Sequence, residues 1–210
     1  MANVNAPFGL AVAKGGGSYA GNQRATMYSI PTSDSTNAYY MGDAVKAAAS
    51  GDPNGIPNVA LCAGTDPLRG VVVGIINPFP AGNANSGASS SLALEVNYVP
   101  VTKANPYYVM VEDDPTTVFV MQDDGLTTSK LVAASCNLNF SFTVTAGSTT
   151  NSSSGSVILS SSFAVTSSLN MKALGLAQGP WDGVQNAFGQ YAKWLCRINL
   201  SELTGSFVGI

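Results

Sequence analysis

Alternation of apolar and polar residues is the main pattern along this chain. The clearest case is Asn137–Thr145, where Leu138, Phe140, Phe142 and Val144 alternate with polar residues. A period of two predicts a β-strand with one face in a core and the other in water.

Other segments carry the same signal. Leu92–Val99 places Leu92, Leu94, Val96 and Tyr98 on one side, and Tyr191–Ile198 places Trp194, Cys196 and Ile198 opposite Lys193 and Arg197. Shorter candidate strands lie at Thr26–Ile30, Ala44–Ala48, Val59–Cys62, Gly70–Ile76, Tyr107–Val111, Val118–Met121, Val157–Leu159 and Lys172–Leu176.

Turn signals such as Asp52-Pro53-Asn54-Gly55 and Asp123-Asp124-Gly125 separate these segments. Many short strands between such turns are typical of an all-β fold, an antiparallel β-sandwich or barrel. Evidence for helices is thin. Thr128–Ser135 could form two turns, and Ala44–Ala49 has helical propensity, but neither shows an amphipathic stripe.

Three polar stretches predict long Ser/Gly-rich loops or arms, at Ala2–Gly21, Ala81–Ser91 and Gly147–Ser156. They offer little to bury, so we expect them to become ordered only against a neighbour. We therefore expect an extended N-terminal arm over residues 1–21 and a single β domain over residues 22–210. In the arm, Pro7, Phe8 and Leu10 precede three glycines and could anchor a partner; alternatively, Phe8 and Leu10 begin the first strand.

Charge is scarce. Charged residues make up 10% of the chain, against about 25% in an average soluble domain. A surface so poor in charge costs little to desolvate, which suits a subunit that buries its exterior in an assembly. The net charge is −3, and the nine basic residues are spread from Lys14 to Arg197 without a cluster. Direct binding of nucleic acid, which needs concentrated positive charge, is therefore not expected.

The sequence contains no histidine, which removes the commonest general base and metal ligand. We therefore expect no enzymatic activity and no cofactor. Two acidic groups, Glu112-Asp113-Asp114 and Asp123-Asp124, flank a candidate strand. If a hairpin brought Asp113, Asp114, Asp123 and Asp124 together, they could hold Ca²⁺ or form a paired-carboxylate glycosidase site. Their spacing matches no calcium loop, which favours a third interpretation, a solvated acidic turn.

The three cysteines, Cys62, Cys136 and Cys196, form no C-x-x-C pair, so we expect buried free thiols rather than a zinc or redox site. The N-terminal residues lack the basic-then-apolar order of a signal peptide. No stretch reaches the roughly 18 apolar residues of a membrane-spanning helix. A location in the cytoplasm until assembly is the expectation that follows.

Several phrases of the chain, in the same order over nearly its whole length, are similar to a family of small head proteins of tailed bacteriophages, the decoration or cement proteins. They are Ala2–Leu10, Ile30-Pro31 with Ser33-Asp34-Ser35, Tyr40–Val45, Gly70–Gly74, Tyr108–Pro115, Lys172–Leu176 and Ala192–Asn199. The chain departs from the family at Leu200-Ser201, in place of a histidine-containing ending, and in the inserts at Ala81–Ser91 and Gly147–Ser156.

The resemblance implies a virion protein made in the cytoplasm of a bacterial host and bound to the outer surface of the capsid. There it would cement neighbouring subunits of the major capsid protein against the pressure of packaged DNA. It would associate with itself, as a homotrimer or, as second choice, a dimer. Residues Asn5, Pro7, Phe8 and Leu10 of the arm would contact the partner, and deletion of Ala2–Gly17 would weaken head binding without unfolding the sheet. A tail or baseplate protein and a receptor-binding adhesin are the alternatives.

Overall fold

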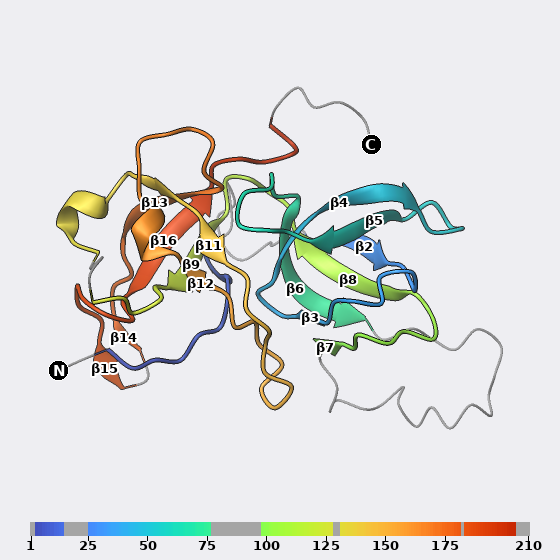
Figure 1. The fold of residues 1–210 in the computed structure, drawn as a ribbon, viewed down its shortest axis with the longest axis horizontal. Coiled ribbons are helices and arrows are strands. Elements are labelled where there is room, and N and C mark those ends of the chain that lie inside the picture. Colours follow the sequence, from blue (N-terminus) through green and yellow to red (C-terminus); the bar gives the residue numbers. More distant parts are fainter. Residues whose placement is uncertain (1–2, 15–24, 77–97, 128–130, 182, 205–210) are drawn as a thin grey trace.

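The fold is built almost wholly from β-strands (Figure 1). The computed structural model describes residues 3–14, 25–76, 98–127, 131–181 and 183–204. In these ranges the helical elements are two single 3₁₀ turns, η2 (Ala133–Ser135) and η3 (Ser160–Ser162). The prediction of an all-β sandwich or barrel is confirmed. Over the same ranges, no helix has the length and apolar character needed to cross a bilayer.

One part of the molecule is a closed barrel of five strands. Their order around the barrel is β2 (Thr26–Ile30), β5 (Pro57–Leu61), β4 (Ala44–Gly51), β6 (Gly70–Ile76) and β8 (Tyr107–Glu112). The β2–β5 pair is parallel and the other four pairs are antiparallel. Closure leaves no unpaired edge. The barrel interior is filled mainly by β-branched and aromatic side chains, among them Ile30, Tyr39, Val45, Val72 and Val109.

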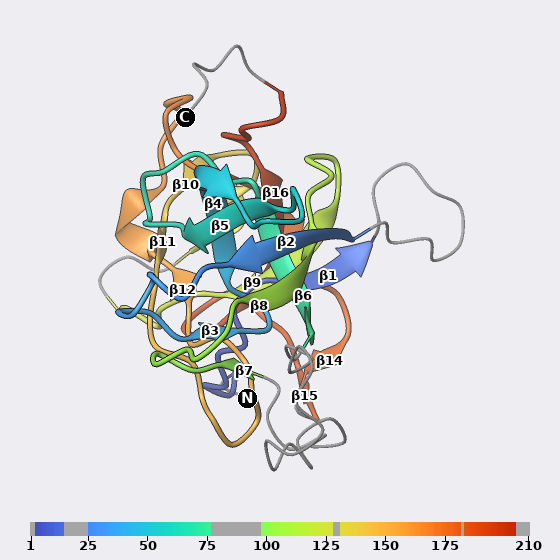
Figure 2. The same cartoon turned by 90° about the vertical axis from the view of Figure 1, so that its right-hand side faces the viewer.

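The other part is a five-stranded antiparallel sheet, which lies behind the barrel strands in the view of Figure 2. Its order is β1 (Ala11–Lys14), β9 (Val118–Gln122), β16 (Lys193–Ile198), β13 (Met171–Leu176) and β10 (Asn139–Phe140). Its inner face carries Phe119, Met121, Trp194 and Cys196, all fully buried. These residues alternate with outward-facing ones, as the period of two requires.

Three short two-stranded ladders complete the described strands. They are β11 (Phe142–Thr143) with β12 (Val157–Ile158), β14 (Pro180–Trp181) with β15 (Val184–Gln185), and β3 (Tyr39–Tyr40) with β7 (Tyr98–Val99). All three ladders are antiparallel.

The barrel and the sheet share a core. The larger hydrophobic cluster joins Phe140, Met171 and Trp194 of the sheet to Ala44 and Val71 of the barrel strands. Side chains from both parts therefore exclude water from one continuous interior.

The predicted strands are only partly observed in their predicted form. Phe140 and Phe142 are buried as predicted, but the Asn137–Thr145 segment divides between two ladders and Val144 is exposed. The strand predicted at Ala44–Ala48 is confirmed and extends to Gly51 as β4. In Leu92–Val99, residues 92–97 lie outside the described part, and Val99, on the face expected to be polar, belongs to the barrel core.

The N-terminal segment does not lie apart from the sheet. Strand β1 pairs with β9, and Leu10, at 2% exposure, is part of the larger core. The expectation of a separate arm is therefore wrong for residues 3–14. Neither Phe8 nor Leu10 lies in a strand, since β1 begins at Ala11, but Leu10 packs into the core directly before it. Residues 15–21 of the expected arm lie outside the described residues, as does the loop expected at Ala81–Ser91.

The Gly147–Ser156 segment is ordered by its own chain rather than by a neighbour. Met41 N donates to the Ser152 carbonyl at 3.2 Å, and Ser154 N donates to the Met41 carbonyl at 2.8 Å. Ser154 and Ser156 are buried and their hydroxyls lie 3.0 Å apart. The expectation that this segment needs a partner to order it is wrong. Serine hydroxyls can form the hydrogen bonds that the polar groups of a buried turn require, so the turn need not be solvated.

Candidate interaction surface

Few of the charged side chains that the structure describes are mainly exposed. Five are buried, Asp43, Lys103, Glu112, Asp123 and Lys193, and most of the others are half-buried. The Lys103 ammonium, for example, donates to the backbone carbonyls of Asp34, Asn37 and Val101. A buried ion without such partners would cost several kcal/mol, so these contacts fix the surrounding loops.

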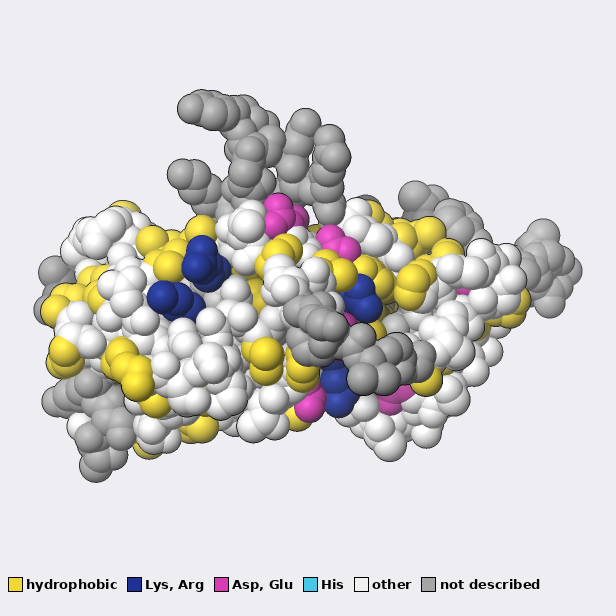
Figure 3. Space-filling view, turned by 90° about the horizontal axis from the view of Figure 1, so that it is seen from above, with side chains coloured by type: hydrophobic (Ala, Val, Ile, Leu, Met, Phe, Trp, Pro, Cys, Tyr) yellow, Lys and Arg dark blue, Asp and Glu magenta, His cyan; other side chains and the backbone are white. Residues whose placement is uncertain are grey.

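The charges nearer the surface are also largely engaged. Lys46 pairs with Asp66 at 2.6 Å and Arg69 with Glu202 at 3.1 Å. Among the residues whose exposure the structure describes, Arg197 is the one charged residue that is mainly exposed. Figure 3 shows the result on one face, where uncharged polar and apolar atoms cover most of the surface. Removing water from such a surface costs little free energy.

The two acidic groups do not converge. Glu112 ends β8 and Asp113 and Asp114 follow it, whereas Asp123 and Asp124 follow the far end of β9. Five strand residues separate them, about 16 Å at the rise of a β-strand. Within the described ranges, no group of three or more acidic or cysteine side chains gathers as a metal site would require.

Asp123 instead forms hydrogen bonds with nearby backbone groups. Asp123 accepts hydrogen bonds from the backbone N–H groups of Gly125, Tyr191 and Ala192 at 2.8, 2.8 and 3.0 Å. Burial raises the pKa of Asp123 to about 6, although the three donors act in the opposite direction. Asp123 therefore ties the end of β9 to the start of β16.

The four residues predicted to contact a partner lie along the N-terminal segment in different settings. Asn5 is exposed, Pro7 and Phe8 are half-buried, and Leu10 is buried in the core. Leu10 is therefore not available to a partner in this conformation. The Asn5 side chain oxygen accepts from Gln122 Nε2 at 2.8 Å, which fixes the segment over β9.

Phe8 lines an apolar groove where the N-terminal segment meets the barrel. The groove has a volume of about 340 Å³. Its walls are Phe8, Leu10, Ala11, Val12, Met41, Gly42, Val72, Val73 and Ser153, which we call the Phe8 groove. Met41 at its rim is 41% exposed. An open concave apolar surface is the usual form of a site for an apolar side chain of a partner.

Two glycines allow the backbones under the Phe8 groove to approach closely. Gly9 has φ +69°, and a Cβ there would lie 2.5 Å from the Gly42 carbonyl oxygen. Gly42 has φ +89°, and its Cβ would lie 2.5 Å from the Phe8 carbonyl oxygen. Glycine is the residue that adopts this conformation without strain. The groove floor thus depends on both glycines.

Asp43 supports the same floor from inside. Its carboxylate accepts from Tyr40 N at 2.8 Å and lies in hydrogen-bonding contact with the Ser154 side chain. Burial raises the pKa of Asp43 to about 6, because the charged form loses hydration that these two donors only partly replace. Asp43 is thus a structural carboxyl that joins the β3–β4 turn to the serine-rich segment.

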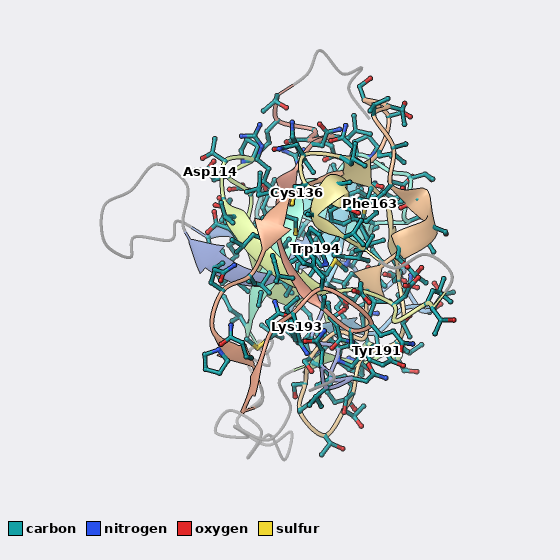
Figure 4. The ribbon with its side chains drawn as sticks, turned by 90° about the vertical axis from the view of Figure 1, so that its left-hand side faces the viewer. Asp114, Cys136, Phe163, Tyr191, Lys193 and Trp194 are labelled. Carbon is teal, nitrogen blue, oxygen red and sulfur yellow. The ribbon has the colours of Figure 1, made fainter. Side chains whose placement is uncertain are left out.

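The aromatic side chains form core contacts rather than an exposed platform. Tyr39 and Trp194 are fully buried, and Tyr40 stacks on Tyr98 with ring centroids 5.4 Å apart. Figure 4 shows Trp194 in the interior with Phe163 nearby, and their centroids lie 6.3 Å apart.

The three cysteines are free, as predicted; Cys62 and Cys196 are buried and Cys136 is half-buried. Burial raises the pKa of the Cys62 thiol to about 12, and raises that of Cys196 as well. Thiols in this state are poor nucleophiles, so the two buried cysteines act as small apolar residues.

Sequence reasoning found Phe8 but missed the residues that complete its groove. Met41 lies between Tyr40 and Gly42 in a turn that the sequence predicts. The sequence does not indicate, however, that this turn packs against the N-terminal segment. Ser153 lies more than a hundred residues further on in a stretch expected to be a loop. Only the folded chain brings these parts together.

Comparison with protein-family models, with curated proteins and with solved structures gave no match.

Proposed function

We propose that this chain is a non-catalytic virion protein that binds the outer surface of a bacteriophage head and cements subunits of the major capsid protein. The observation that carries the proposal is the scarcity of displayed charge, with charged side chains drawn into internal contacts and Arg197 alone mainly exposed in the described part of the chain. A protein that works alone in solution gains from surface charge, whereas a subunit of a shell must shed water from its exterior.

The Phe8 groove supplies the contact in this proposal. Phe8, Met41 and Val73 present apolar area next to polar backbone, so an apolar side chain of a capsid subunit would lose water there at little electrostatic cost. Such a contact is modest for one copy. Repetition over a lattice, where every copy binds only the assembled state, makes modest contacts sufficient.

Head binding by one groove variant and a matched control tests the proposal. Met41→Asp places a charge in the groove, whereas Val165→Asp places the same charge at a residue that is 89% exposed and does not line it. We expect Met41→Asp to weaken binding to undecorated heads at least tenfold and Val165→Asp to leave it unchanged in co-sedimentation. Binding of wild-type protein to tails but not to heads would contradict the proposal and favour the tail or adhesin alternative.

A further inference from the structure

The loop between β4 and β5 carries the one Asn-Gly pair of the sequence, Asn54-Gly55. Both residues are exposed, and a Cβ on Gly55, whose φ is +82°, would meet no atom within 4 Å. Figure 1 shows this loop at the outer end of the barrel, away from the five-stranded sheet. The Asn54 side-chain amide and the backbone nitrogen that follows it are therefore open to water.

An exposed Asn-Gly pair can react without an enzyme. The backbone nitrogen of Gly55 attacks Cγ of Asn54, so that an N–Cγ bond forms, the Cγ–Nδ2 bond breaks and ammonia leaves, carrying the proton that the Gly55 nitrogen gives up through solvent. One water then opens the succinimide ring at either of its two C–N bonds, and the product is aspartate or isoaspartate. Glycine favours ring closure because it has no side chain beside the attacking nitrogen.

In the folded loop both reacting groups are engaged by Asp52. The Asp52 carbonyl accepts from Gly55 N at 3.0 Å. The Asp52 carboxylate accepts from Asn54 Nδ2 at 3.1 Å and from Asn54 N at 2.9 Å. The proton that must be lost is thus shared with one acceptor, and the amide that must be attacked is held by another. Both contacts have to open before the ring can close.

Asp52 is itself held in place by neighbouring groups of the barrel. Its Oδ1 also accepts from Ile56 N at 2.8 Å, and its Oδ2 accepts from the Tyr108 hydroxyl on β8 at 2.7 Å. Desolvation acts to raise the pKa of Asp52, but the hydrogen bonds from Ile56, Tyr108 and Asn54 outweigh it and lower the pKa below its usual value. The carboxylate is therefore ionised at neutral pH, and hydrogen bonds to an ionised acceptor are the stronger kind.

We infer that Asn54 is a site of spontaneous deamidation and that Asp52 sets the rate by holding the folded loop in an unreactive conformation. The product adds a negative charge to a surface where Arg197 is the one mainly exposed charged residue among those described. It also places a second carboxylate beside that of Asp52, in the position of the Asn54 donor, and like charges this close repel. The site shares no residue with the Phe8 groove and does not depend on binding to phage heads.

Asp52→Ala tests this control of the rate. The full chain is incubated at neutral pH, and peptide mass spectrometry follows the conversion of Asn54. We expect conversion to be about tenfold faster than in the parent protein, or more, which is the population change expected when a hydrogen bond to a charged group is lost. Asn54→Gln in the same Asp52→Ala background should remove the conversion, because the longer side chain would have to close a larger ring.

Asp114→Ala is the matched control. The turn that Asp114 opens is built like the turn that Asp52 opens, since the Asp114 carboxylate accepts from Thr116 N at 2.8 Å and its carbonyl accepts from Thr117 N at 3.1 Å. It contains no Asn-Gly pair. Asp114→Ala should therefore weaken a turn of the same kind and leave the Asn54 rate unchanged. An equal acceleration in the two variants would indicate general loosening of the fold and would overturn the role of Asp52.

The urea-unfolded chain gives the rate of the unrestrained pair. A folded parent protein that deamidates as fast as the unfolded chain would overturn the protection by Asp52, and an unfolded chain that does not convert at Asn54 would overturn the site itself. Tyr108→Phe is the second variant, because it removes one donor to Asp52 without changing the loop sequence. With folding of each variant verified by circular dichroism, Tyr108→Phe should deamidate faster than the parent but more slowly than Asp52→Ala. A Tyr108→Phe rate equal to that of the parent counts against the inference.

Discussion

At the scale of single residues, buried carboxyls hold this fold together at its turns. Asp43 joins the β3–β4 turn to the serine-rich segment, and Asp123 joins the end of β9 to the start of β16. Each receives backbone or hydroxyl donors, which makes burial tolerable without a cation. Because the donors do not fully replace water, burial still raises the pKa of each carboxyl to about 6.

These shifts predict how stability depends on pH. A carboxyl whose native pKa lies above the unfolded value of about 3.9 binds protons more tightly when folded. The free energy of unfolding should therefore rise as pH falls from about 6 to about 4 and be flat just above 6. For Asp43 the rise is at most about 3 kcal/mol, at 1.36 kcal/mol per pKa unit. Urea unfolding at several pH values measures it.

Asp43→Asn is the control for this dependence. It keeps an acceptor for Tyr40 N but cannot titrate, so it should lose the Asp43 share of the pH dependence and retain that of Asp123. Carboxyls with a lowered pKa, such as Asp34 and Asp66, act in the opposite direction only nearer pH 4 and below. A wild-type protein that becomes less stable between pH 6.5 and 4.5 would contradict the assignment.

A second residue-scale prediction concerns Gly9. An alanine there would have to adopt φ +69° and place its Cβ 2.5 Å from both the Gly42 carbonyl oxygen and Ser154 Cβ. Both neighbours are held by hydrogen bonds of the groove floor, so Gly9→Ala should lower the free energy of unfolding by about 2 kcal/mol or more. Gly55→Ala is the matched control, because Gly55 also has a positive φ, +82°, but no atom lies within 4 Å of its Cβ. Equal losses in the two variants would rule out close approach as the cause.

At the scale of elements, the sequence predicts strands well and their partners poorly. The apolar and polar pattern predicted β2 and β6 at their observed bounds, and it predicted the buried face of β16. It does so because a strand buried on one face has apolar residues at every second position. It missed β1 and the two-residue strand β3, which are too short to show a period. Lys193 was expected to face water, yet it is buried under the N-terminal segment, a contact between residues 189 positions apart.

The N-terminal segment is accordingly the element whose role changes most. Its Val4 carbonyl accepts from Lys193 Nζ at 2.7 Å, and Ala6 N donates to Gln122 Oε1 at 2.9 Å. Side chains of the sheet thus bind the backbone of the segment before β1 begins. The same buried polar groups would be left without these partners if the segment were removed.

Deletion of residues 2–17 should therefore unfold or strongly destabilise the sheet rather than only weaken head binding. Leu10→Ala isolates the core part of this effect and should cost about 2–5 kcal/mol, as a buried Leu→Ala change does. Val4→Ala is the control, since Val4 is 40% exposed, and should cost less than about 0.5 kcal/mol. Denaturant unfolding of both variants measures the difference. A deletion variant as stable as the parent would show that the segment only rests on the sheet.

At the scale of the whole molecule, two architectures share one interior. The barrel has its own cluster around Val45 and Val109, but Ala44, Leu68 and Val71 from the barrel side belong to the core of the sheet. Neighbouring residues of β4 and β6 therefore face different cores. Loss of packing in either part removes support from the strands that both parts use.

This sharing predicts a single cooperative unfolding transition. Ile30→Ala weakens the barrel cluster and Met171→Ala weakens the sheet cluster; both side chains are fully buried, and each change should cost about 2–5 kcal/mol. If the cores unfold together, each variant lowers one common midpoint by about 2–4 °C per kcal/mol, whichever part carries the change. Calorimetry gives the number of transitions, and hydrogen exchange resolves the barrel strands from the sheet strands. Separate transitions, with Ile30→Ala shifting only the barrel and Met171→Ala only the sheet, would show that the contacts of Ala44, Leu68 and Val71 are too weak to couple the two parts.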